Sequence, residues 1–188
     1  AGSMLPWKSK ECEKKLERVV NRVADFEKVS FEQFEKDGKK HIFNARFIDM
    51  KKLYENITLP VRATKQSAGH DICIPFDCNL APGASAMIPT GLKCKMEEGY
   101  VMMVFPRSSL GIKHRMSLNN TTGIIDCDYY NNPDNEGHIF ASVRNNGDHI
   151  LQLKAGDKIV QALFVPFGVA DQEEVTTERT GGIGSTNK

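Results

Sequence analysis

The segment Gly123-Ile-Ile-Asp-Cys-Asp-Tyr129 is the most informative part of this chain. It places the carboxylate of Asp126 and the ring of Tyr129 among β-forming residues, although a strand interior disfavours aspartate. Two interpretations of Asp126 follow: a turn former at the end of a strand, or a general base placed beside a substrate. Asp128 lies on the same face by the two-residue period of a strand, and is an alternative candidate for the structural role.

From about Ile42 onward, short runs of Val, Ile, Phe and Met alternate with turn signals such as Asn145-Asn-Gly-Asp148. Many short strands at this spacing predict an all-β sandwich or barrel. No strand–helix–strand alternation appears, which argues against a Rossmann or P-loop domain. The strand candidates are Asn44–Leu53, Asp71–Ile74, Ala86–Cys94, Tyr100–Pro106, Gly123–Ile125, Ile139–Arg144, His149–Leu153 and Lys158–Val165.

Residues 8–36 follow a different pattern, with apolar residues at alternating steps of four and three. This spacing predicts an amphipathic helix. Ser30 is a candidate cap of a second short helix, with Gln33 three residues on, and Asp37-Gly38 is expected to end the segment. The helix either contacts another subunit or an unknown partner, or folds onto the domain's own surface. The apolar residues of the stripe are Cys12, Leu16, Val19, Val23 and Phe26.

The composition excludes several classes of function. The 188 residues suit one core with an appendage, and 25 basic against 24 acidic residues give a net charge of +1. Such balance argues against direct nucleic-acid or membrane binding, and no apolar run approaches the ~20 residues of a membrane span. Ala1-Gly2-Ser3 before Met4 is typical of a cloning remnant. Five cysteines without a CxxC pair predict reduced thiols and a cytoplasmic protein.

Two further clusters are of the kind that binds phosphate. Arg107-Ser-Ser109 follows an apolar strand, and a guanidinium with neighbouring hydroxyls can bind phosphate oxygens, although such a triplet is more often a solvated turn. Gly181-Gly-Ile-Gly-Ser-Thr186, which follows Arg179, can form an anion-binding nest of backbone amides, but it is not a Walker A motif. A glycine-rich end of this kind is by itself more often disordered.

The remaining polar residues carry weaker signals. Asp71, after Ala68-Gly-His70, is by itself interpreted as a turn cap, and His70 as a partly exposed strand residue. None of the five histidines has metal-ligand spacing, so no transition-metal site is expected. The HxE…PCxxC pattern of zinc nucleobase deaminases is absent.

Taken in order, these clusters resemble the five motifs of the trimeric dUTPase family (deoxyuridine 5′-triphosphate nucleotidohydrolases). The resemblance covers about residues 44–188, and Asp126 with Tyr129 separates the chain from the related dCTP deaminases. The motifs are Ser67-Ala-Gly-His-Asp-Ile72, Pro106-Arg-Ser-Ser-Leu-Gly111, Asn120-Thr-Thr-Gly-Ile-Ile-Asp-Cys-Asp-Tyr129, Gly156-Asp-Lys-Ile-Val-Gln-Ala-Leu163 and Arg179-Thr-Gly-Gly-Ile-Gly-Ser-Thr186.

The resemblance implies a distorted jelly roll, a homotrimer with active sites at subunit junctions, and Mg²⁺-dependent hydrolysis of dUTP to dUMP and pyrophosphate. That reaction limits uracil incorporation into DNA and supplies dUMP. Asp126 then matches the base that activates water, and Asp71 a residue that supports the metal through water. Matching phosphate-binding positions are Arg107, Ser108, Ser109, Gln161, Arg179, Ser185 and Thr186. Matching uracil and deoxyribose positions are Asn120, Gly123, Ile125, Tyr129 and Ile183.

Three departures from the family accompany the match. Residues 130–137 lengthen the loop after Tyr129, Ile183 stands where the family usually has Phe, and residues 4–40 have no counterpart in the minimal family core. The expected organisation is a helical extension (4–40), a β core (41–168) and a mobile glycine-rich arm (169–188). Two alternatives remain: a deaminase-like or bifunctional relative, and a regulatory nucleotide-sensing module on the same fold.

Overall fold

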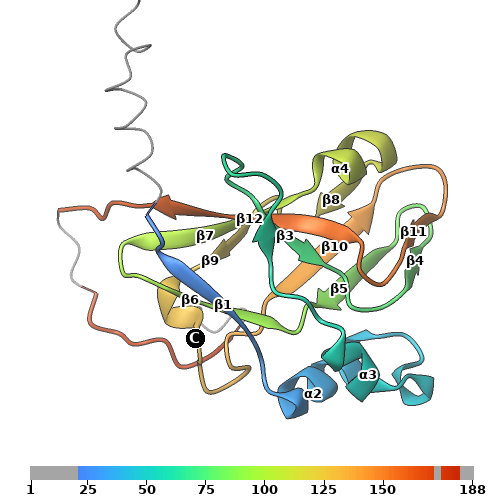
Figure 1. The fold of residues 1–188 in the computed structure, drawn as a ribbon, viewed down its shortest axis with the longest axis horizontal. Helices are drawn as coiled ribbons and strands as arrows, with labels where there is room; N and C mark the ends of the chain where they lie inside the picture. Colours follow the sequence, from blue (N-terminus) through green and yellow to red (C-terminus); the bar gives the residue numbers. More distant parts are fainter. Residues whose placement is uncertain (1–20, 172–174, 183–188) are drawn as a thin grey trace, which may run out of the picture.

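The computed structural model describes residues 21–171 and 175–182, in which antiparallel strands form four small sheets around one buried cluster (Figure 1). This architecture confirms the predicted all-β class. The strands are β1 (Ala24–Lys28), β2 (Val61–Arg62), β3 (His70–Cys73), β4 (Cys78–Leu80), β5 (Ser85–Pro89), β6 (Leu92–Met96), β7 (Tyr100–Pro106), β8 (Met116–Leu118), β9 (Gly123–Ile125), β10 (Phe140–Asn145), β11 (Leu151–Leu153) and β12 (Lys158–Pro166). The helices are α2 (Phe31–His41), α3 (Met50–Glu55) and α4 (Ser108–His114), with 3₁₀ turns η2 (Ala45–Phe47) and η3 (Cys127–Tyr129).

The largest sheet has the order β2-β3-β12-β7-β9, and its long central pair is β12 with β7. Strand β9 lies at its edge, with Gly123 opposite Val104 and Ile125 opposite Met102. The other sheets are β5-β10-β8, β1-β6 and β11-β4. This order places the informative segment at an open sheet edge, where the chain is free to turn away after Ile125.

Most predicted strands form close to their expected bounds, including β7 at the predicted residues. The candidate Ala86–Cys94 is instead divided into β5 and β6 at Gly91. That glycine has φ +74°, and a Cβ there would lie 2.2 Å from Cδ1 of Ile57, so a side chain is disfavoured both by the backbone conformation and by the neighbour. The chain therefore turns at Gly91, between two sheets.

The predicted helix is wrong for its described part. Residues Ala24–Lys28 form β1, which pairs with β6, and their exposure alternates with a period of two. Val23 and Phe26 fit helical spacing, but pairing with an available sheet edge outweighs so short a pattern. Cys12, Leu16 and Val19 lie outside the described residues.

Ser30 caps α2 as predicted, and its Oγ accepts a hydrogen bond from the amide of Gln33 at 3.1 Å. The expected end at Asp37-Gly38 is wrong, because α2 continues to His41. Asp37 is buried and hydrogen-bonded rather than placed in a turn.

The strand expected at Asn44–Leu53 is also wrong. The segment contains η2 and α3 instead, and Asp49 starts α3 by accepting a hydrogen bond from the amide of Lys52 at 3.0 Å. Aspartate is a strong helix N-cap, so this local signal prevails over the apolar residues that suggested a strand.

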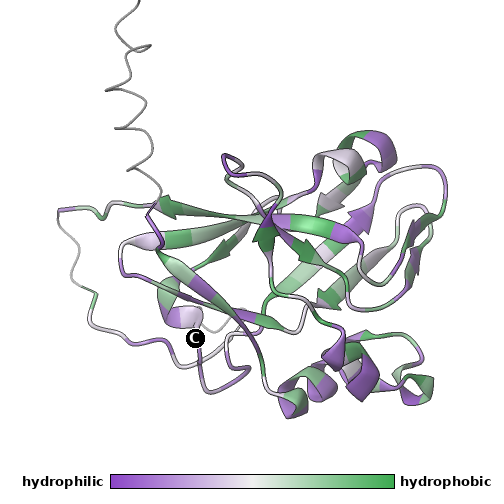
Figure 2. Cartoon of the chain, viewed as in Figure 1, coloured by the Kyte–Doolittle hydropathy of each residue, from purple (hydrophilic) through white to green (hydrophobic). Residues whose placement is uncertain are grey.

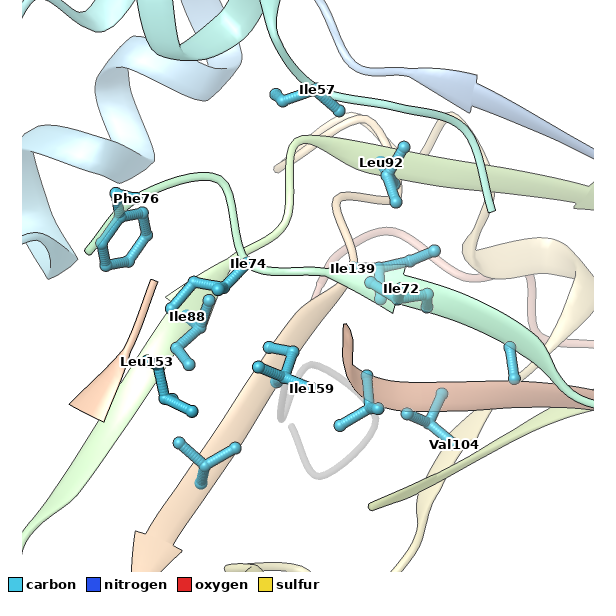
Figure 3. Packing of buried hydrophobic residues seen from close by; sticks show 14 of the residues in the cluster. Ile57, Ile72, Ile74, Phe76, Ile88, Leu92, Val104, Ile139, Leu153 and Ile159 are labelled. Atoms are coloured by element: carbon cyan, nitrogen blue, oxygen red, sulfur yellow. The ribbon is translucent and has the colours of Figure 1, made fainter. Parts of the chain in front are cut away.

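The core joins the N-terminal elements to the sheets. Val29 and Phe34 are fully buried in the same cluster as Ile72, Ile88 and Ile159. Figure 3 shows Ile72, Ile88 and Ile159 of this cluster at close range. Figure 2 shows hydrophobic residues along the central strands and hydrophilic residues over much of the outer helices and loops. The described part of the N-terminal segment therefore packs on its own domain.

Candidate active site

Asp126 follows β9 directly and precedes η3, with φ −79° and ψ 158°. Its side chain is 53% exposed, so its carboxylate is open to solvent at the edge of the sheet. Asp126 therefore ends the strand, and its position beside a pocket is also compatible with the second interpretation, that of a base.

A pocket of about 600 Å³ opens between β10 and the strand–turn–strand segment of residues 116–129, which runs from β8 through β9 to η3 and is called the hairpin below. Its walls are mostly apolar with a few polar groups, which is typical of small-molecule sites. The pocket is lined by four residues that were predicted to bind the nucleoside: Asn120, Gly123, Ile125 and Tyr129. Asp126, the predicted base, and Arg179, a predicted phosphate ligand, line it as well. Apolar walls come from Val104, Leu118, Ile139 and Phe140.

Two hydrogen bonds to the hydroxyl hold the ring of Tyr129 in place. The hydroxyl donates to the carbonyl of His138 at 2.8 Å and accepts from Nδ2 of Asn135 at 2.8 Å. Burial raises the pKa of Tyr129, so the phenol stays protonated at neutral pH and remains a donor. The ring is therefore a rigid wall of the pocket.

Arg179 connects the C-terminal arm to the hairpin. Its Nη2 lies 2.6 Å from Oδ2 of Asp126, and its Nε lies 2.7 Å from Oδ1 of Asp128. The guanidinium carbon also lies 5.8 Å from the centre of the Tyr129 ring. One cation thus contacts both carboxylates of the informative segment. Ile183, Ser185 and Thr186 lie outside the described residues.

Arg107 and Gln161, which are also predicted to bind phosphate, lie beside Asp71 in a second cluster. Rather than capping a turn, Asp71 is buried in β3, with one oxygen 2.7 Å from Nη1 of Arg107 and the other 2.9 Å from Nζ of Lys158. Gln161 is opposite Asp71 in the register of β12, and its Nε2 lies 3.4 Å from the carbonyl of Pro106. Ser108 and Ser109 are exposed at the start of α4. Sequence reasoning missed Lys158, although it lies within the fourth motif.

The two clusters lie far apart in one chain. Asp126 follows Ile125, which is opposite Met102, whereas Arg107 lies five residues beyond Met102, just past the end of β7. At ~3.3 Å per residue the separation along the strand is roughly 16 Å. Figure 1 shows α4 on the right and the gold helical turn of residues 127–129 on the left. A single chain therefore does not bring Arg107 and Asp126 to one phosphorus atom.

The described residues offer no protein-made metal cage. Among residues 21–171 and 175–182, no group of three or more His, Cys, Asp or Glu side chains is arranged to hold a metal ion. The oxygens of Asp71 lie 2.7 and 2.9 Å from the cationic groups of Arg107 and Lys158, which compete with a metal ion for this buried carboxylate. The set fits Mg²⁺ only as an ion held chiefly by phosphate oxygens and waters.

Two other features of the described chain bear on the predictions. Cys73, Cys78, Cys94 and Cys127 are free thiols, so Cys73 and Cys78 are not bonded to each other. No helix in this part of the chain combines the length and apolar character needed to cross a membrane.

The fold and the pocket define a class: an all-β protein with a small-molecule pocket that has a carboxylate and an arginine in its lining. A family model described as dUTPase matches residues 55–187, and the chain belongs to the dUTPase family. Residues 21–54, which form β1, α2, η2 and most of α3, precede the matched range.

Relatives and solved structures agree with this assignment. The deoxyuridine 5′-triphosphate nucleotidohydrolase of Lactococcus lactis is 47% identical over 137 residues, covering 71% of this chain and 91% of the relative. That of Hahella chejuensis is 35% identical over 144 residues, covering 72% and 91%. The crystal structure of the Streptococcus mutans dUTPase has a TM-score of 0.60 at 37% identity, covering 78% of this chain and 98% of that one. These likenesses confirm the predicted jelly-roll-like dUTPase fold.

A dUTPase from phage phi11 of S. aureus is similar in fold alone, with a TM-score of 0.59 at 21% identity. It covers 83% of this chain and 98% of the phage protein. That structure is described as coordinating a structural Mg(II) ion.

Proposed function

We propose that this protein hydrolyses dUTP to dUMP and pyrophosphate at the pocket between the hairpin and β10. The observation that carries the proposal is the position of Asp126, an exposed carboxylate beside a pocket lined by the hairpin backbone and the ring of Tyr129. Membership of the dUTPase family and the named activity of relatives at 47% and 35% identity support the substrate.

In the proposed reaction, the carboxylate of Asp126 takes a proton from a water molecule whose oxygen attacks the α-phosphorus. The bond between this phosphorus and the oxygen bridging to the β-phosphorus breaks, and pyrophosphate leaves with that oxygen. A positioned base of this kind typically contributes ~10²–10⁴-fold to the rate. Phosphoryl transfer otherwise depends on positioning and charge neutralisation, which are the roles of Arg107 and Arg179 here.

The nucleoside end of the pocket sets the choice of substrate. Backbone groups of the hairpin at Gly123 and Ile125 present a fixed pattern of donors and acceptors to the uracil edge, and the amino group of cytosine presents a donor where an acceptor is needed. Asn120 extends this pattern. The ring of Tyr129 lies against the deoxyribose and excludes a 2′-hydroxyl. Because the Tyr129 hydroxyl both donates and accepts a hydrogen bond, the ring is fixed in this position.

Each active site takes its parts from more than one copy of the chain, in a homotrimer. The separation of roughly 16 Å along β7 between the levels of Asp126 and Arg107 supports this arrangement, because both groups must reach one triphosphate. A head-to-tail ring places the phosphate cluster of one subunit against the hairpin of the next. Ser108, Ser109 and Gln161 then act with Arg107, whereas Arg179, Ser185, Thr186 and Ile183 act from the arm.

A bound Mg²⁺ would be held chiefly by phosphate oxygens and waters, and would supply charge neutralisation to the triphosphate. Asp71 contributes by holding Arg107 and Lys158 in place and through water near the ion. The protein acts as a cytoplasmic hydrolase that limits uracil incorporation into DNA and supplies dUMP.

One assay tests the proposal: pyrophosphate release from dUTP, compared with dCTP, dTTP and UTP, with and without Mg²⁺. We expect turnover of dUTP alone, stimulated by Mg²⁺. Ammonia release from dCTP would identify a deaminase or a bifunctional relative. Binding of dUTP without turnover would identify a nucleotide sensor and contradict the proposal.

A further inference from the structure

We infer that Asp37 and His138 are positioning residues that fix the ring of Tyr129, and that they thereby set the discrimination between deoxyribo- and ribonucleotides. The inference rests on the proposed role of Tyr129 beside the sugar. It assigns a function to α2, which lies outside the range matched by the dUTPase family model.

The loop of residues 130–138 encloses the phenol of Tyr129. Asn135 donates to the hydroxyl, and the side chain of Asn132 donates to Oδ1 of Asn135 at 2.7 Å and to the carbonyl of Tyr129 at 2.8 Å. Gly137 has φ +79°, and a Cβ there would lie 2.6 Å from that same carbonyl. The loop therefore has little freedom to shift without moving the ring.

Hydrogen bonds of the His138 side chain to Asp37 and Gly91 hold this loop in place. Nδ1 of His138 lies 2.6 Å from Oδ2 of Asp37, and Nε2 of His138 accepts from the amide of Gly91 at 2.8 Å. Because Nε2 accepts, the proton of a neutral ring lies on Nδ1 and is donated to Asp37. Gln33 donates to the same Asp37 oxygen at 2.8 Å, and all three side chains are buried.

A second clamp joins the start of α2 to the same loop. The carboxylate of Glu136 accepts from the amide of Ser30 at 2.9 Å and from its hydroxyl at 2.5 Å. Lys93 lies 3.8 Å from Glu136. The start of α2 and Asp37 within it are thus hydrogen-bonded to Glu136 and His138, the two ends of this segment. The carbonyl of His138 in turn accepts from the Tyr129 hydroxyl.

The hydrogen-bond network of Asp37 and His138 reaches the proposed substrate pocket. His138 lines the pocket together with Tyr129 and Phe140, and the His138 and Phe140 rings lie 4.5 Å apart. A hydroxyl group is small, so its exclusion depends on the Tyr129 ring staying within a fraction of an ångström of its position. Loss of the anchor at Asp37 releases His138, and with it the carbonyl that holds the phenol.

The test is the ratio of kcat/KM for dUTP to that for UTP, measured on the full-length protein well below its melting temperature. We expect Asp37→Ala to lower this ratio at least ~10-fold, the scale of discrimination that a small group in a pocket supplies. Asp37→Asn, whose amide oxygen can still accept from His138, should restore the ratio to within a few-fold of wild type. Leu153→Ala is the matched control: Leu153 is buried in the same core cluster but lies in β11, which pairs with β4, so its ratio should not change even if its melting temperature falls.

A second variant covers the case in which Asp37→Ala fails to fold. Ser30→Ala removes the hydroxyl bond to Glu136 and the side-chain cap of α2, keeps the amide bond and opens no cavity in the core, and should lower the ratio a few-fold. An unchanged ratio in the folded Asp37 and Ser30 variants, with a collapsed ratio in Tyr129→Ala, would overturn the inference alone. An unchanged ratio in Tyr129→Ala would overturn the proposed role of Tyr129, and the inference with it.

Discussion

The guanidinium of Arg179 lies 2.6 Å from the carboxylate of Asp126, although 53 positions separate the two residues in the chain. The proposed base and a proposed phosphate ligand thus neutralise each other before a triphosphate binds. The carboxylate of Asp126 is about half exposed, and ion pairs of this kind typically contribute ~0–1 kcal/mol. A bound triphosphate, with several negative charges, can therefore displace Asp126 from Arg179.

The substitution Asp126→Asn should reduce kcat by ~10²-fold or more, because it keeps the shape of the side chain and removes the base. Binding of a non-hydrolysable dUTP analogue should persist. The matched control is Asp128→Asn, which removes the other carboxylate bonded to Arg179. If Asp126→Asn retained more than about a tenth of the wild-type kcat, Asp126 would not be the base.

Ending the chain after Glu178 should lower kcat/KM by ~10²-fold, since loss of a preorganised charge-stabilising group typically has this effect. Thermal stability should change little, because no apolar strand is lost and the ion pairs of Arg179 join exposed carboxylates. Arg179→Lys separates the two features of the side chain: it keeps the charge and loses the planar fork. Full activity in the truncated protein would show that the arm has no part in catalysis.

Ile183 lies outside the described residues, and its role stays a prediction. A β-branched side chain can cover the uracil but lacks the stacking of an aromatic ring, which contributes ~0.5–1.5 kcal/mol beyond area burial. We therefore expect Ile183→Phe to lower the Kd for a non-hydrolysable dUTP analogue a few-fold and to protect the arm from proteolysis. Unchanged values of both would indicate that the loop of residues 130–137 already covers the base.

The buried Asp37 predicts a specific loss of stability in acid. Burial alone would raise the pKa of Asp37, but its hydrogen bonds with His138 and Gln33 outweigh burial and hold the pKa below its ordinary value of 3.8. A lowered pKa stabilises the folded state above pH 3.8, and this contribution is lost as the pH falls through the folded-state pKa.

Urea midpoints measured between pH 7 and pH 3 check this expectation. Asp37→Asn should lose less stability than wild type below about pH 4, because it has no proton to gain. Glu32→Gln, an exposed carboxylate on the same helix, is the control and should follow the wild-type curve. Parallel curves for wild type and Asp37→Asn would contradict the proposed coupling.

The sequence predicted the parts of the fold that local pattern and ordered motifs determine. Strand β7 forms at the predicted residues because its apolar run has no competing local signal, and Ser30 caps α2 because its hydroxyl reaches the amide of Gln33. The strand at Ala24–Lys28 was not predicted, because a sheet edge contributed by Leu92–Met96 decides it. Local spacing carries no information about such a distant partner.

The candidate site likewise contains residues that the sequence predicted and residues that it did not. Asn120, Gly123, Ile125, Asp126 and Tyr129 lie together because they are close in the chain, and a motif reveals them. The contact of Asp37 with His138 spans 101 positions and has no local signal. Lys158 was within reach of sequence reasoning, since a cation three residues before Gln161 lies in the fourth motif, but its pairing with Asp71 needed the sheet register.

In the proposed trimer one active site needs residues from two copies of this chain, and mixing two inactive variants measures whether this is so. Asp126→Asn and Arg107→Gln should each be nearly inactive alone. Co-expressed in equal amounts with different tags and purified as mixed assemblies, they should recover about a third of the wild-type rate of pyrophosphate release, because in a three-membered ring that contains both variants about one junction in three combines an intact Asp126 with an intact Arg107. Mixed assemblies no more active than the separate variants would contradict a shared site.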